Sequence, residues 1–192
     1  MGKGRLEAFS DGVVAIIITI MVLEMKTPPG PGLDALRSVI PVFLSYVLSF
    51  VFVGIYWNNH HHLMHAVHHV NGAILWANLH LLFWLSLAPF VTAWMSDTRW
   101  APVPVAAYGV VLLCAAIAYF VLTRVLLSAH EKDSRLAKAL GSDVKGKASM
   151  LLYAVAIPAA FIHPLIACSL YVMVAVMWLV PDRRFERVLM EG

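Results

Sequence analysis

Apolar stretches that contain no Asp, Glu, Lys or Arg recur along the whole chain, at residues 12–23, 38–59, 70–96, 100–123 and 148–181. A helix that crosses a bilayer needs about 20 apolar residues, so the second, third and fourth stretches each predict one spanning helix. Hydrophobic residues make up 61% of the chain and charged residues only 13%, against roughly 25% charged in soluble domains. The sequence therefore predicts an all-α integral membrane protein.

The first and last apolar stretches are harder to assign. The first has the length of a signal-peptide core, but no small-residue cleavage site follows it, and we expect a helix whose polar ends contact protein or water. The last is too long for one span, and Pro164 divides it because proline cannot continue a helical ladder. We expect one domain, 1–192, with six spans at residues 9–26, 36–59, 70–96, 101–127, 147–163 and 164–181.

The basic residues predict the orientation of these spans. Cytoplasmic loops of membrane proteins carry an excess of Lys and Arg. Of the 14 Lys and Arg residues, three lie on one side of the six expected spans and the other eleven on the opposite side. The three are Lys26, Arg37 and Arg99. We therefore expect a multi-pass protein of the cell membrane with both termini in the cytoplasm, and the net charge of +3 is no evidence for nucleic-acid binding.

The first expected helix has two distinct sides. At 100° per residue, its apolar side carries Phe9, Gly12, Val13, Ile16, Thr19, Ile20 and Leu23. Ser10 and Asp11 project the other way. A carboxylate inside a bilayer is costly, so we expect Ser10 and Asp11 to point into the protein and the Ile16 side to face lipid, the same subunit or another copy.

Polar partners for Asp11 are available at the same depth. The second expected helix ends in Trp57, Asn58, Asn59 and His60, and the third stretch carries Asn71, Asn78 and His80. We expect a polar network in which Arg5, Ser10 and Asp11 meet these donors, because buried polar groups need partners. The alternative is that Asp11 only caps the N-terminus of its helix, where the helix dipole favours an anion.

The pattern Arg5-x-x-x-Phe9-Ser10-Asp11, followed by AIIITIMVLEM, resembles the hallmark of the transmembrane-protein-175 family of potassium channels. The Trp57-Asn58-Asn59-His60 segment is also similar to that family. The resemblance extends over the whole chain in helix number and orientation, but specific residues match mainly in the first two helices. It implies that a single six-helix repeat assembles as a homotetramer.

The resemblance also implies that the first helix lines the pore and that potassium is the permeant ion, with no cofactor. The implied constriction consists of Ile16, Ile20 and Leu23, with Thr19 beside them. Arg5, Phe9, Ser10 and Asp11 would then hold this helix against the next two, with Trp57, Asn58, His60 and Asn71 as their partners. No TVGYG filter is present, so selectivity would depend on the dehydration cost at a hydrophobic gate.

Six of the nine histidines lie in HHHLMHAVHH. If this segment is helical, His61, His65 and His68 share one face. Such a group could bind zinc or copper, could titrate near neutral pH, or could simply form a polar cytoplasmic connection. These three interpretations remain open from the sequence.

Two other function classes are less well supported by the sequence. A His-rich carrier of divalent metals needs ligands deep in the membrane, and only His80 lies well inside an expected span. An enzyme needs a base or nucleophile with an orienting partner, and the later helices offer only scattered Ser, Thr and Asn. A channel is therefore the expected function, with the metal-binding protein as the alternative and no enzymatic activity.

Overall fold

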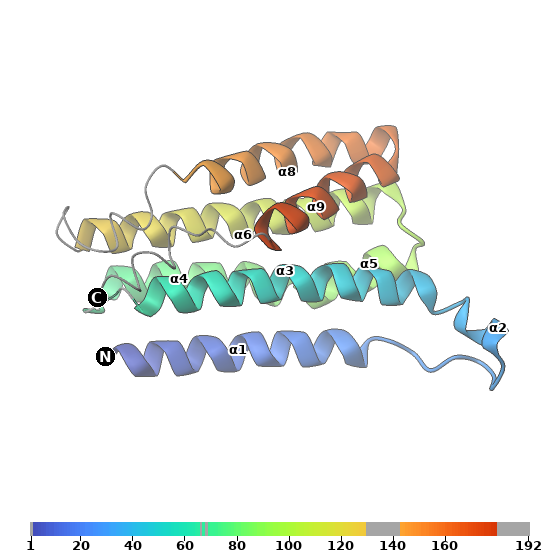
Figure 1. Ribbon diagram of the computed structural model, residues 1–192, viewed down its shortest axis with the longest axis horizontal. Helices are drawn as coiled ribbons and strands as arrows, with labels where there is room; N and C mark the ends of the chain where they lie inside the picture. The colour runs from blue at the N-terminus through green and yellow to red at the C-terminus, as the bar shows by residue number, and fades with distance from the viewer. Residues whose placement is uncertain (1, 66, 68, 130–142, 180–192) are drawn as a thin grey trace.

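The computed structural model describes residues 2–65, 67, 69–129 and 143–179, and every regular element in these ranges is a helix. The helices are α1 (Lys3–Leu23), α2 (Leu33–Leu36), α3 (Ile40–His65), α4 (Gly72–Ser86), α5 (Ala88–Asp97), α6 (Pro102–Ala129), α8 (Val144–Ile162) and α9 (Pro164–Leu179). Apart from the short α2, they form a bundle of roughly aligned helices, with α1 at one edge and α8 at the opposite edge (Figure 1).

Within the described ranges, five helical segments are long and apolar enough to cross a membrane, and α9 is a shorter apolar helix of 16 residues. One of the five segments, Gly72–Asp97, consists of α4 and α5 together. The prediction of an all-α membrane protein is confirmed.

Several helix limits differ from the expected ones, and three of the differences bear on the site. The first helix begins at Lys3 instead of residue 9. The second continues to His65, so the first histidines of the cluster belong to a helix and not to a connection. The third is interrupted at Leu87, because Pro89 has no N–H to donate and its ring crowds the preceding turn.

The side chains form two apolar cores. One joins α1, α3, α4 and α6 around fully buried residues such as Leu63, Ile74 and Leu122. The other joins α3, α5, α6, α8 and α9 around Tyr108 and Tyr171. No buried side-chain nitrogen or oxygen in the described part of the chain lacks a hydrogen-bond partner, as a structure surrounded by lipid requires.

Candidate pore-lining helix

α1 has one buried side and one exposed side. Its buried residues are Leu6, Ser10, Val14, Ile17 and Met21, spaced three or four apart as one face of a helix requires. This face packs against α3, α4 and α5. On the exposed side, Ile16 is 58% exposed, Ile20 41% and Leu23 80%. One copy of the chain therefore leaves an apolar helix face uncovered along the edge of the bundle.

A buried chain of hydrogen bonds anchors the inward side of α1. Ser10 Oγ donates to the Leu6 carbonyl at 2.9 Å and accepts from Asn78 Nδ2 at 3.0 Å. Asn78 Oδ1 lies 2.7 Å from His60 Nε2, and because an amide oxygen can only accept, the imidazole Nε2–H is the donor. All three side chains are buried, so this chain links α1, α4 and α3 inside the bundle.

Asp11 does not join this buried chain. Its side chain is exposed, and its Oδ1 accepts a hydrogen bond from Trp57 Nε1 at 2.9 Å. The expectation that both side chains are buried in the protein thus holds for Ser10 only, whereas the expected partnership of Asp11 with Trp57 on the second spanning helix is present. Successive residues of a helix differ by 100°, so the two side chains bind different neighbouring helices.

Asn71 has a different role from the one expected. Its Oδ1 accepts from the backbone N–H of Ile74 at 3.0 Å, which makes it the N-cap of α4. Asn71 precedes Asn78 by seven residues, or about 10 Å of helix rise, so it lies too far from Ser10 to take part in the network. Asn78 takes part in the network instead.

Three further residues expected in the network lie on the surface of the single copy. Arg5 and Asn58 are exposed, and Phe9 is 50% exposed. Near the start of α1, Lys3 Nζ donates to the backbone oxygen of His65 at 3.3 Å. This contact places the beginning of α1 beside the end of α3.

The four residues expected at the constriction lie on the exposed part of α1. Thr19 is exposed together with Ile16, Ile20 and Leu23. Its Oγ1 donates to the Ile16 carbonyl at 2.9 Å, which leaves the oxygen lone pairs of the hydroxyl available as acceptors. The exposed side therefore combines three large apolar side chains with one oxygen that can accept a hydrogen bond or contact a cation.

The histidine cluster forms part of an aromatic series on α3. The His61 ring stacks on Trp57 at 5.8 Å between centroids and lies 4.5 Å from the His65 ring. His68 lies outside the described residues. Among the residues that the structure describes, no group of three or more His, Cys, Asp or Glu could hold a metal ion.

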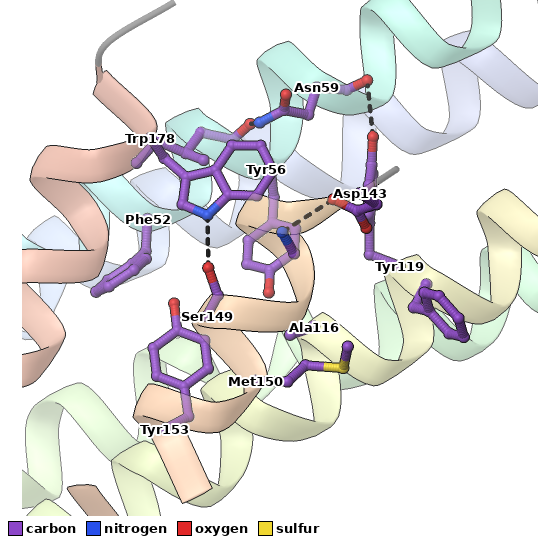
Figure 2. Close-up of a pocket in the computed structure, with 13 residues that line it drawn as sticks. Phe52, Tyr56, Asn59, Ala116, Tyr119, Asp143, Ser149, Met150, Tyr153 and Trp178 are labelled. Carbon is purple, nitrogen blue, oxygen red and sulfur yellow. Dashed lines mark hydrogen bonds between the residues drawn. The ribbon is translucent and has the colours of Figure 1, made fainter. Parts of the chain in front are cut away.

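A small cavity lies away from α1, between α3, α6, α8 and α9 (Figure 2). Its walls include Tyr56, Tyr153 and Ser149, whose Oγ accepts from Trp178 Nε1 at 2.8 Å. The cavity volume is about 30 Å³, which is enough for about two water molecules. Among its described lining residues none belongs to α1, so this cavity is not a route along the exposed side of that helix.

Comparison with known proteins decides the family. Residues 5–89, from Arg5 into α5, match the family model described as endosomal/lysosomal potassium channel TMEM175. A protein named as a potassium channel from Chryseobacterium sp. (strain P1-3) is 52% identical over 192 residues, which is the full length of both chains. The chain belongs to the TMEM175 family. This is a family of ion channels, not of enzymes.

Two further TMEM175 relatives show how the similarity is distributed. The crystal structure of a lysosomal potassium-selective channel TMEM175 homolog from Chamaesiphon minutus matches with a TM-score of 0.75 and 28% identity. That match covers 93% of this chain and 96% of the other. The human endosomal/lysosomal proton channel TMEM175 is 39% identical over 75 residues, covering 33% of this chain and 15% of the human protein. The fold is thus shared along nearly the whole chain.

Proposed function

We propose that the chain is a potassium channel in which four copies surround a central pore lined by α1. Each copy crosses the cell membrane six times, with both termini in the cytoplasm. The observation that carries the proposal is the division of α1 into two sides. Ser10 is held inside the bundle by Asn78, while Ile16, Ile20 and Leu23 are uncovered in a single copy.

The apolar side of α1 explains how such a pore closes. Four copies of Ile16 around one axis form a ring too apolar to keep water in a narrow passage, and dewetting blocks ions. When the helices move apart, a cation passes with part of its hydration shell. Potassium gives up water at a lower free-energy cost than sodium, so this pore prefers potassium without a ring of backbone carbonyls.

Thr19 supplies the polar contribution to this mechanism. Its hydroxyl already donates to the Ile16 carbonyl, so its oxygen is available as a weak ligand for a passing cation. Four such oxygens at one level offset part of the dehydration cost between the apolar rings formed by Ile16 and Ile20. The mechanism needs no cofactor.

The test is potassium flux through purified protein in liposomes. Replacing Ile16 with Asn makes the narrowest ring polar, keeps it wet, and should raise flux at least tenfold. Ile117→Asn is the matched control, because Ile117 is 41% exposed on α6 and not on the helix proposed to line the pore. The same rise in both variants, or no flux in wild type and Ile16→Asn, refutes the proposed pore.

The number of copies has an independent test. The mass of the protein in detergent or in lipid nanodiscs, measured by native mass spectrometry, should correspond to four chains of 21.2 kDa. A stable monomer is incompatible with a pore built from one helix per subunit.

A further inference from the structure

The cavity between α3, α6, α8 and α9 combines a carboxylate with aromatic walls (Figure 2). The carboxylate belongs to Asp143, the residue that precedes α8. The aromatic side chains that line the cavity are Phe52, Tyr56, Tyr119, Phe120, Tyr153 and Trp178. The faces of aromatic rings attract cations, and a carboxylate attracts them more strongly. The lining therefore favours an occupant with a positive charge.

Two tyrosine hydroxyls at the cavity have no hydrogen-bond partner in the described part of the chain. They belong to Tyr56 on α3, which is 9% exposed, and to Tyr153 on α8, which is 2% exposed. Both side chains extend into the space between the helices (Figure 2). Their oxygens are reached from the cavity, so they are not among the fully enclosed polar atoms. Buried hydroxyls need partners, and the occupant of the cavity can supply them.

The fold uses only part of the Asp143 side chain. Its Oδ1 accepts a hydrogen bond from the backbone N–H of Gly146 at 2.9 Å, which caps the start of α8. Asp143 is half-buried, and its carboxylate forms no ion pair with a Lys, Arg or His of the described ranges. A carboxylate withdrawn from water favours a cationic partner, so the helix cap alone does not account for this charge.

The size of the cavity selects the kind of cation. Its volume is about 30 Å³, which is room for about two water molecules, or for the carbon and nitrogen at the end of a primary alkylammonium. That group carries three N–H donors, which match the carboxylate and the two tyrosine oxygens. A trimethylammonium group is bulkier and has no N–H. A potassium ion must replace its hydration shell with oxygen ligands, and walls made mainly of rings offer few.

A basic residue lies beside the cavity wall. Arg124 on α6 is exposed, and its guanidinium carbon lies 5.1 Å from the centroid of the Phe120 ring, which lines the cavity. Basic residues at the ends of membrane helices bind the phosphates of lipid headgroups. Arg124 is therefore placed to bind the phosphate of a headgroup whose ammonium enters the cavity.

We propose that this cavity binds a primary ammonium group, with Asp143 as its charge partner and the hydroxyls of Tyr56 and Tyr153 as hydrogen-bond acceptors. Two sources carry this group: the phosphoethanolamine headgroup of a membrane lipid, and small soluble amines. Among the described lining residues none belongs to α1, so the site is separate from the proposed pore and goes beyond the proposed function.

Lipid binding to the full-length protein in detergent tests the first source. Native mass spectrometry compares phosphatidylethanolamine with phosphatidylcholine of the same acyl chains, and the wild type should bind the former at least tenfold more tightly. Asp143→Asn should abolish this preference while it keeps the start of α8, because Asn caps helices as well as Asp does. Asp34→Asn is the matched control, because Asp34 is an exposed residue of α2, and it should keep the preference.

Thermal unfolding of the same lipid-depleted protein tests the second source. A ligand that binds the folded state raises the unfolding temperature, so methylammonium chloride should stabilise the wild type more than tetramethylammonium chloride at equal concentration. Tyr153→Phe keeps the ring and removes one acceptor, and it should weaken methylammonium binding roughly tenfold. Arg124→Gln should weaken the binding of phosphatidylethanolamine but leave the effect of methylammonium unchanged.

The outcomes identify the source or overturn the inference. A preference for phosphatidylethanolamine that depends on both Asp143 and Arg124 supports the lipid headgroup. Stabilisation by methylammonium that depends on Asp143, without a lipid preference, supports a soluble amine. The absence of both effects, or effects of the same size in Asp143→Asn, overturns the inference. None of these measurements involves ion flux, so failure here leaves the proposed channel standing.

Discussion

Removing the amide of Asn78 should loosen the attachment of α1 to the bundle. Asn78 is fully buried and makes two side-chain hydrogen bonds, to Ser10 at 3.0 Å and to His60 at 2.7 Å. Asn78→Leu fills nearly the same volume but breaks both bonds. Hydrogen bonds between membrane helices contribute about 0.6 kcal/mol on average and at most about 1.7 kcal/mol, so we expect a loss of about 1–3 kcal/mol in the free energy of unfolding.

Asn78→Leu, Ser10→Ala and the double variant together show how much of the lost unfolding free energy belongs to each of the two hydrogen bonds. Ser10→Ala removes only the bond to Asn78 and the local bond to the Leu6 carbonyl, so it should cost about half as much as Asn78→Leu. In the double variant the two costs should not add, because both substitutions remove the same contact. Reversible unfolding in SDS, followed by tryptophan fluorescence, measures all three free energies.

The same variants should change the channel as well as its stability. If Ser10 holds the rotation of α1 about its own axis, its release should alter the proposed ring of Ile16 side chains and change potassium flux in liposomes. An Asn71→Ala variant serves as the control, because it removes only the N-cap of α4 and should cost about 1 kcal/mol without changing flux. Full wild-type stability and flux in Asn78→Leu would refute the anchoring role.

Two further substitutions test other contacts by the same unfolding assay. A Cβ at Gly109 would overlap the Tyr171 hydroxyl, so Gly109→Ala should lower the free energy of unfolding by about 1–3 kcal/mol. Gly54→Ala is the control, because no atom lies within 4 Å of its new Cβ, and it should change stability by no more than about 1 kcal/mol. Equal effects of the two substitutions would contradict this packing. Trp57→Phe keeps an aromatic side chain but removes the indole N–H that donates to Asp11, and it should cost about 1 kcal/mol. A variant as stable as wild type would show that the bond contributes nothing.

Much of the fold could be predicted from the sequence, because long uncharged stretches in a membrane protein have few alternatives to helices. The exact helix limits could not. In the structure α3 continues to His65, and Leu63 and Met64 in its last turn are buried in the core that includes α1. The interruption at Leu87 was signalled by Pro89 within the third stretch, a signal that the expectation of one continuous helix did not use.

The site was predictable in outline but not in its individual contacts. Helical spacing placed Ser10 opposite the Ile16 side, and the structure buries Ser10 and exposes Ile16. The choice between Asn71 and Asn78 required the register between α1 and α4, which no single-helix pattern contains. An Asn in the middle of an apolar stretch needs a buried partner more than an Asn at the start of a helix does. This physical argument favours Asn78.

The hydrogen bonds that join α1 to α3 and α4 in the described chain all involve Lys3, Ser10 or Asp11, in its N-terminal half. Apolar packing continues along α1 as far as Met21, but in the described chain no hydrogen bond to α3 or α4 fixes the helix beyond Asp11. If α1 tilts about Ser10, then Leu23, about 20 Å along the helix, moves roughly twice as far as Ile16, which is about 9 Å away. In the proposed pore the outer mouth widens most during opening, and the ring at Ile16 stays the narrowest point that every ion must pass.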